Sequence, residues 1–91
     1  MSSVKQTLKI VNIKGLHARA SAKLAETVER FDAEAVVSKD GLEASGDSIM
    51  GLLMLAASIG TSIDVETTGA EAEELAKAIA ELVADKFGEG N

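Results

Sequence analysis

The stretch AEAVVSKDGLEAS, residues 33–45, decides the fold because a turn signal separates two runs that fit β-strands. Asp-Gly is a dipeptide favoured by tight turns in which φ is positive. The runs at 33–38 and 42–45 flank Lys39-Asp40-Gly41, so the sequence predicts a β-hairpin with one strand on each side. We expect an antiparallel sheet to be built around this hairpin.

Two elements are predicted before the hairpin. Apolar and polar residues alternate over residues 4–11, as in a strand with one face toward water. After a loop from Asn12 to His17, a helix is predicted to begin just after His17 and to bury one apolar stripe. The stripe consists of Ala20, Leu24, Val28 and Phe31.

A second helix and a fourth strand are predicted after the hairpin. Gly46-Asp47-Ser48 supplies residues suited to a helix cap, and Gly60 offers a stop. These signals predict a helix over about residues 48–57. From Ile63 to Glu66 the side chains alternate again, which indicates the fourth strand.

The last predicted element is a third helix. Thr68-Gly69-Ala70-Glu71 matches a capping box, and apolar residues at helical spacing continue from it to about Phe87. Residues 88–91 are expected to fray. The order strand-helix-strand-strand-helix-strand-helix predicts an α+β fold, with a four-stranded antiparallel sheet covered on one face by three helices. Residues 1–91 are expected to form a single domain.

The composition argues against several classes of function. With 15 acidic against 9 basic residues and a net charge of −6, the chain would be repelled by nucleic acid. The longest apolar stretch, Ile49 to Ala57, is too short to cross a bilayer, so no membrane insertion is expected. Because cysteine is absent and only one histidine is present, neither a disulfide nor a metal site is predicted. We expect a cytoplasmic protein without metal or cofactor.

The single histidine, His17, has four interpretations. It can be a surface residue or a helix cap, the ordinary role of a polar residue beside a helix. It can be a metal ligand, although only carboxylates could join it. It can be a general base, although no nucleophile turn such as Gly-x-Ser-x-Gly is present. Finally, it can itself be a nucleophile, because a neutral imidazole carries a reactive lone pair and needs no activating base.

The residues after His17 suit a phosphoryl group. At a helix start, the free N–H groups of Ala18, Arg19 and Ala20 would face a bound phosphate. The guanidinium of Arg19 can also meet phosphate oxygens through two parallel hydrogen bonds. Because the first turn of a helix disfavours a cation, the position of Arg19 argues for a functional role. These features fit the nucleophile interpretation of His17, in which His17 and Arg19 are the predicted catalytic residues, while the other interpretations stay open.

The motif Gly15-Leu16-His17-Ala18-Arg19 resembles the active-site signature of the HPr family, the histidine-containing phosphocarriers of the bacterial phosphoenolpyruvate-dependent phosphotransferase system. The likeness covers nearly the whole chain, including the element order and Ser48 to Leu55. It implies an open-faced β-sandwich in which His17 is phosphorylated on Nδ1 and Arg19 steadies the phosphoryl group. It also implies a stoichiometric carrier, not an enzyme, which we expect to be a monomer.

The same resemblance implies partners. Enzyme I would phosphorylate His17, and a IIA-type acceptor would take the phosphoryl group on. Ser48 matches a serine that is phosphorylated by an ATP-dependent kinase in some members, an HPr kinase/phosphorylase, although a serine at this place also suits a helix cap. The alternative function is a regulatory adaptor, controlled by phosphorylation of Ser48 and binding its partners through the second helix.

The second predicted helix carries apolar residues on too many sides to bury them all. Some of them are therefore predicted to be exposed as a docking patch beside His17, where methionine can adapt to several partners. The predicted patch consists of Ala20, Ile49, Met50 and Leu53.

Two departures from the family pattern bear on the site and its partners. Ala20 stands where the usual pattern has proline, which would fix φ at the helix entry. Glu26 and Glu29 stand where many sugar-transport members have lysines that meet an acidic Enzyme I. Residues 31–34 and 48–55 are more similar to the nitrogen-related branch, so sugar transport and nitrogen regulation both stay open.

Overall fold

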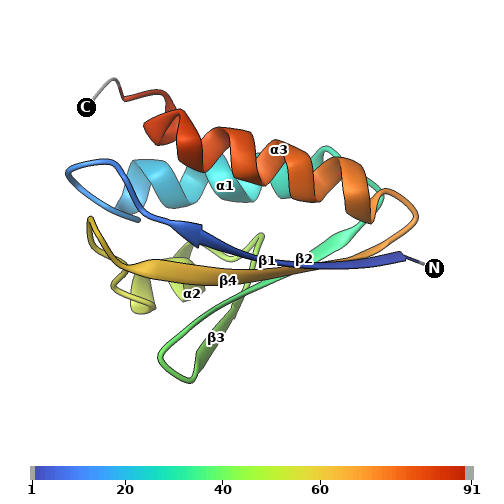
Figure 1. Cartoon of the computed structure of the whole chain (residues 1–91), viewed down its shortest axis with the longest axis horizontal. Coiled ribbons are helices and arrows are strands. Elements are labelled where there is room, and N and C mark those ends of the chain that lie inside the picture. The colour runs from blue at the N-terminus through green and yellow to red at the C-terminus, as the bar shows by residue number, and fades with distance from the viewer. Residues whose placement is uncertain (1, 90–91) are drawn as a thin grey trace.

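The computed structural model describes residues 2–89, and its elements follow the predicted order (Figure 1). Four strands and three helices are followed by a short turn, η1. Their bounds are β1 (Ser2–Lys9), α1 (Ala18–Glu29), β2 (Glu34–Lys39), β3 (Leu42–Ser45), α2 (Ile49–Met54), β4 (Ser62–Gly69), α3 (Ala72–Ala84) and η1 (Lys86–Gly88). Within residues 2–89, none of the helices has both the length and the apolar composition needed to span a membrane.

The sheet has the strand order β1-β4-β2-β3, and each neighbouring pair is antiparallel. The predicted hairpin joins β2 to β3, and its turn residues Asp40 and Gly41 have φ values of 52° and 83°. Two successive positive φ angles match the right-handed twist of the flanking strands, which explains the Asp-Gly pair. β1 runs from Ser2 to Lys9, so it begins and ends two residues earlier than the predicted strand over residues 4–11.

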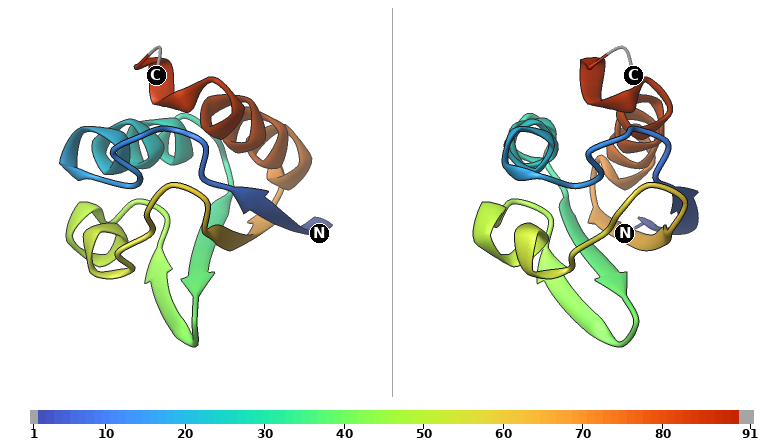
Figure 2. Two further views of the ribbon diagram at one scale, coloured as in Figure 1. Left: turned by 60° about the vertical axis from the view of Figure 1, so that its left-hand side comes forward. Right: turned by 90° about the vertical axis from the view of Figure 1, so that its left-hand side faces the viewer.

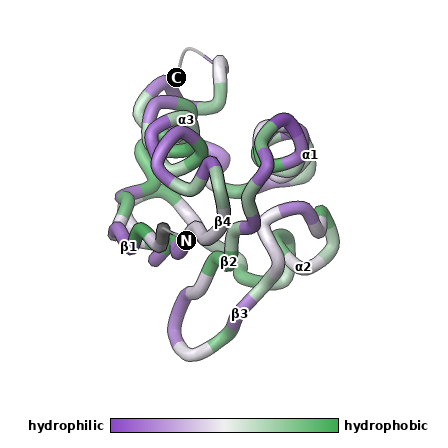
Figure 3. Tube along the Cα trace, turned by 90° about the vertical axis from the view of Figure 1, so that its right-hand side faces the viewer, coloured by the Kyte–Doolittle hydropathy of each residue, from purple (hydrophilic) through white to green (hydrophobic). Residues whose placement is uncertain are grey.

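The core lies between the sheet and the two long helices, α1 and α3, which cover one face (Figures 1 and 2). The short helix α2 packs beside α1 and β3. Hydrophobic and hydrophilic segments alternate around the coils of α1 and α3, as expected for helices with one buried side (Figure 3). The larger aliphatic side chains that are fully buried include Ile10, Leu24, Leu52, Ile63, Leu75 and Ile79.

The opposite face of the sheet is polar. Thr7 Oγ1 donates a 2.7 Å hydrogen bond to the carboxylate of Asp64, its direct partner across β1 and β4. Lys5 stands opposite Glu66 in the same register. Cross-strand pairs of this kind stabilise an antiparallel sheet on its wet face. The predicted fold, a sheet with helices on one face and none on the other, is therefore confirmed.

Helix α2 is shorter than predicted. It ends at Met54, whereas the sequence pattern predicts a helix to residue 57. Ala56 has a φ of 52°, so the backbone leaves the helix well before Gly60. The apolar pattern was misleading because Leu55 and Ala57 are buried as parts of a loop, each 3% exposed.

The start of α3 also differs from the prediction. Thr68 and Gly69 belong to β4, which is longer than predicted, and no side-chain hydrogen bond caps α3. The N-cap is Glu71, whose Oε1 accepts a 2.7 Å hydrogen bond from the backbone N–H of Asp32. The predicted capping box is therefore wrong, because Glu71 binds the loop after α1 and not its own helix.

Candidate functional site

The loop before α1 is fixed by a glycine that packs against the segment after α2. Gly15 has a φ of +65°, and a Cβ atom there would lie 2.3 Å from the carbonyl oxygen of Ala57. The next residue, Leu16, donates its N–H to the same oxygen at 2.8 Å and buries its side chain. Glycine fits both the backbone conformation and the close approach. The loop therefore presents His17 at a defined position.

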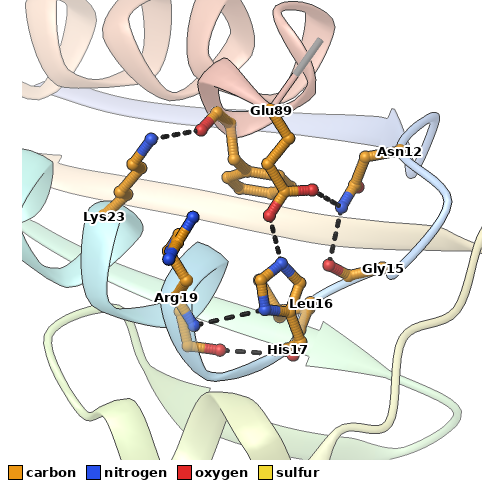
Figure 4. Close-up of polar contacts among 9 residues, drawn as sticks. Asn12, Gly15, Leu16, His17, Arg19, Lys23 and Glu89 are labelled. Carbon is orange, nitrogen blue, oxygen red and sulfur yellow. Dashed lines mark hydrogen bonds and ion pairs between the residues drawn. The ribbon is translucent and has the colours of Figure 1, made fainter. Parts of the chain in front are cut away.

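His17 is the N-cap of α1 and holds its ring against the helix start (Figure 4). Its Nδ1 accepts a 3.3 Å hydrogen bond from the backbone N–H of Arg19, and its carbonyl accepts one of 2.8 Å from Ser21. A backbone N–H can only donate, so Nδ1 carries its lone pair in this arrangement. The imidazole is 26% exposed and accessible from solvent. The structure thus shows His17 as a helix cap, and it leaves Nδ1 unprotonated, as the nucleophile interpretation requires.

The other ring nitrogen, Nε2, is paired with the carboxylate of Glu89 (Figure 4). The second oxygen of this carboxylate, Oε1, accepts a 2.9 Å hydrogen bond from Asn12 Nδ2. Asn12 Nδ2 also donates to the carbonyl oxygen of Gly15 at 2.8 Å. Glu89 therefore joins the imidazole to the loop that precedes it.

The chain reaches the site through a tight turn after α3. Lys86, Phe87 and Gly88 have φ values of 56°, 54° and 76°. Phe87 is fully buried in the core, and its carbonyl oxygen accepts a 2.7 Å hydrogen bond from Lys23 Nζ in α1. The buried ring and the lysine together fix the turn, and the turn places Glu89 beside His17.

This turn bears on two predictions and corrects one of them. Helix α3 ends at Ala84 and does not run to Phe87, because the positive φ angles of η1 reverse the chain. Gly88 and Glu89, in the stretch predicted to fray, donate their N–H groups to the carbonyls of Asp85 and Lys86, and the Glu89 side chain contacts Asn12 and His17. The rest of the predicted fray, residues 90–91, lies outside the described residues.

The surroundings of Glu89 favour its ionised form. Partial burial raises the pKa of the carboxyl group, but hydrogen bonds from Asn12 and His17 lower it. The positive charge of Lys14, and that of the His17 ring when it is protonated, lower it further, and the resulting pKa lies below the ordinary value of 4.5. The carboxylate is therefore a persistent negative charge beside Nε2.

An open hollow of about 520 Å³ lies beside this cluster. Its lining includes the cationic side chains of Lys14, Arg19 and Lys23 as well as His17 and Glu89. In a chain with a net charge of −6, this hollow is a local concentration of positive charge. Lysine and arginine both bind phosphate oxygens, so the hollow suits a small anion that reacts at the imidazole.

Comparison with known proteins identifies the family. The family model for the PTS HPr component phosphorylation site, PTS-HPr, matches residues 4–85. The chain belongs to the HPr family. Phosphocarrier protein HPr of Neisseria meningitidis serogroup A is 47% identical to it over 96% of this chain and 98% of the relative. Phosphocarrier protein NPr of Escherichia coli K12 is 43% identical over the same shares.

Solved structures of the HPr family have the same fold. The crystal structure of HPr-C-His from Thermoanaerobacter tengcongensis has a TM-score of 0.88 at 37% identity and covers 98% of both chains. The family resemblance read from residues 15–19 is therefore confirmed. Relatives named HPr and NPr both match at similar identity. The comparison therefore establishes the family but does not distinguish its sugar-transport branch from its nitrogen-related branch.

The predicted docking residues fall into two groups. Ile49 and Met50 are 42% and 72% exposed, and Leu53 lines a smaller hollow that also includes His17. Ala20, in contrast, is fully buried, so its predicted place in an exposed patch is wrong. It is the third residue of α1 and faces the core, as its position in the apolar stripe requires.

Ser48 caps the start of α2. Its Oγ accepts a 3.1 Å hydrogen bond from the N–H of Gly51. The capping role that the sequence predicts for Ser48 is therefore present, whether or not the hydroxyl is ever modified. The side chain is half-buried beside Ile49 and Met50.

Sequence reasoning missed several residues of the site. Lys14 and Lys23 flank the HPr motif, and their positive charge in an acidic chain was a signal that could have been used. Glu89 had no such signal, because its partner His17 lies 72 positions earlier in the sequence. The contact depends on the turn after α3, which no local pattern indicated. The residues missed are Asn12, Lys14, Lys23 and Glu89.

Proposed function

We propose that this HPr-family protein carries a phosphoryl group on His17. Phospho-Enzyme I of the phosphotransferase system donates the group, and a IIA-type protein accepts it. The chain is loaded and unloaded stoichiometrically through a phosphohistidine and is not an enzyme in the usual sense. The observation that carries the proposal is the lone pair of Nδ1 at the start of α1, beside three cationic side chains.

Loading begins with attack by Nδ1 on the phosphorus atom of the donor. The Nδ1–P bond forms as the bond between phosphorus and the leaving nitrogen of the donor breaks, and its electron pair stays with the donor. Unloading is the same step in reverse, with a nucleophile of the acceptor attacking phosphorus. Because the ring is already held at the surface by the helix start, little further ordering is needed to reach the donor.

The charge of the phosphoryl group is stabilised by groups around Nδ1. The N–H of Arg19, which binds Nδ1 in the unloaded protein, is free to turn to a phosphoryl oxygen once Nδ1 is occupied. The N–H of Ala18, which lines the same hollow, is a second backbone donor, whereas Ala20, the third residue of the predicted phosphate-binding backbone, is fully buried and does not line it. The exposed guanidinium of Arg19 supplies two further donors in a planar fork.

The test is to incubate the protein with phosphoenolpyruvate and a cognate Enzyme I and to measure an acid-labile adduct by intact mass. His17 is the only histidine of the chain, so an acid-labile phosphohistidine has one possible location. His17→Ala should abolish the adduct, while Ser48→Ala should leave it unchanged. An acid-labile adduct that survives in His17→Ala would refute the proposal.

The docking surface of the proposed carrier is formed by Ile49, Met50 and Leu53, beside His17. The exposure of Met50 and the position of Leu53 in a hollow next to the imidazole support this assignment. Met50→Asp should reduce the rate of loading from Enzyme I. Leu42→Asp changes an apolar residue of β3 that is also exposed, at 56%, and it is the matched control that should load like wild type.

The alternative role as a regulatory adaptor rests on Ser48. Its half-buried hydroxyl lies at the edge of the docking surface, where a phosphate would add negative charge among apolar side chains. An adaptor should bind its partner equally well after His17→Ala and lose binding after Met50→Asp. Loading by Enzyme I that depends on His17 separates the carrier from this alternative.

A further inference from the structure

We propose that Glu89 is a positioning residue for phosphoryl transfer: its carboxylate keeps the ring proton of His17 on Nε2 and balances the positive charge of the phosphorylated ring. The inference deepens the proposed function and rests on it. It starts from a contact between the last described residue and the imidazole.

The carboxylate is held in one place by contacts at both oxygens. Oε2 is paired with Nε2 of His17, and Oε1 accepts the 2.9 Å hydrogen bond from Asn12 Nδ2. Asn12 is fully buried, and the Glu89 side chain is only 10% exposed. Behind it, Phe87 is anchored in the core. The contact is therefore built by packed groups and is more than a pair of mobile surface charges.

The two hydrogen bonds of the ring define its tautomer. An ionised carboxylate can only accept, so Nε2 is the nitrogen that carries the proton. The N–H of Arg19 can only donate, so Nδ1 is the nitrogen that carries the lone pair. Both contacts favour the same tautomer. The nitrogen that has to attack phosphorus is therefore left unprotonated.

The same contact balances the charge of the transfer step. When Nδ1 bonds to phosphorus while Nε2 keeps its proton, the ring becomes a cation. The carboxylate of Glu89 neutralises this cation directly, as a buried acid does for an imidazolium in hydrolytic triads. On unloading, the N–P electron pair returns to Nδ1 and the ring is neutral again. No proton has to enter or leave Nε2 in either direction.

Other charged groups around the hollow cannot take this role. Lys14, Arg19 and Lys23 are cations and would oppose a positive ring. Their charges suit the phosphoryl oxygens on the Nδ1 side, while Glu89 supplies the negative charge on the Nε2 side. The site thus separates stabilisation of the phosphoryl group from stabilisation of the ring.

The first test is ¹⁵N NMR of the imidazole in the unloaded protein at neutral pH. Wild type should show a protonated Nε2 and an unprotonated Nδ1. Glu89→Ala removes the acceptor, and Glu89→Gln has only one acceptor oxygen for the two donors of Asn12 and His17. Both variants should raise the fraction of the tautomer with a proton on Nδ1. Asp85→Asn, an exposed acid just after α3, is the control and should leave the tautomer unchanged.

The second test measures loading from phosphoramidate, a small phosphoryl donor, and from phospho-Enzyme I. With either donor, Glu89→Ala and Glu89→Gln should be loaded about tenfold more slowly than wild type and Asp85→Asn. Wild type that takes no phosphoryl group from either donor would overturn the proposed function, and this role of Glu89 with it. Normal loading of wild type, together with tautomers and rates in the Glu89 variants equal to those of Asp85→Asn, would overturn the inference alone.

Discussion

Lys23 Nζ in α1 donates a 2.7 Å hydrogen bond to the carbonyl oxygen of Phe87, which lies 64 positions later in the chain. Together with the burial of the Phe87 ring, this bond fixes the turn that brings Glu89 to His17. The packing of the core and the chemistry of the site are therefore linked through the end of α3. Changes at this turn should affect both.

Replacing Phe87 with alanine should strongly destabilise the protein. The ring is fully buried, and removing a buried phenylalanine typically costs about 3–5 kcal/mol of unfolding free energy. Phe31 is only partly buried against the same core, so Phe31→Ala should cost less. Denaturation with urea measures both variants, and equal losses would contradict the assigned role of Phe87.

A side chain at position 15 should damage the loop before α1. Gly15→Ala combines a positive φ with a clash against the carbonyl oxygen of Ala57, whereas Gly60→Ala has a positive φ of +87° and open space around it. Positive φ alone costs about 1–2 kcal/mol for a residue with a Cβ atom. Gly15→Ala should therefore lower the melting temperature more than Gly60→Ala. The opposite order would show that the loop adjusts easily.

Changing Arg19 to lysine should slow phosphoryl transfer although the charge is kept. Lysine lacks the planar fork that binds two phosphoryl oxygens, and a lost hydrogen bond to a charged group corresponds to about a 10- to 100-fold decrease in rate. Because Arg19 is exposed, the free energy of unfolding should change by less than about 0.5 kcal/mol. Stopped-flow loading and thermal melts separate these effects. If Arg19→Lys is loaded at the same rate as wild type, the guanidinium does not stabilise the phosphoryl group through two hydrogen bonds.

Substitutions at Ser48 should separate capping from regulation. Ser48→Ala removes the acceptor for the Gly51 N–H and should cost about 1 kcal/mol of stability. Aspartate is also a good N-cap, so Ser48→Asp should keep most of the stability and add a negative charge beside Met50. If Ser48→Asp then weakens binding to Enzyme I while Ser48→Ala does not, the charge at the docking surface is the regulatory element. Calorimetry of the two complexes provides the comparison.

The contribution of Glu89 to stability should depend on pH in a defined direction. Because the folded pKa lies below 4.5, the folded protein favours the ionised form, and this stabilisation is complete above that ordinary value. It is lost as the pH falls through the lower folded pKa. Wild type should therefore be more stable than Glu89→Gln at about pH 7, and the two should converge at about pH 2. A constant difference over this range would mean that the ionised carboxylate is not involved.

Local signals in the sequence were sufficient for the order of the elements. The Asp40-Gly41 turn and the start of α1 after His17 are set by neighbouring residues, so both were predicted correctly. The end of α2 was not, because Leu55 is buried by contacts from distant elements and looks in the sequence like part of an apolar helix. The end of α2 is therefore set by tertiary packing and not by the local sequence.

The same distinction holds within the site. His17 and Arg19 belong to one short motif and could be found from it, and the exposure of Met50 follows from an excess of apolar residues on a short helix. Ala20 was assigned both to the buried stripe and to the exposed patch, and only the helix orientation in the structure decides between them. Glu89 could not be found, because a contact over 72 positions depends on how α3 ends.

The position of Glu89 has a practical consequence for protein engineering. The first residues of β1 lie on the side of the molecule opposite to the turn after α3, the turn that carries Glu89 to His17 (Figure 1). A purification tag or fluorescent fusion attached within a few residues of Glu89 would be tethered close to the imidazole of His17 and can compete with the carboxylate for it. Tags for kinetic work on this protein belong ahead of β1.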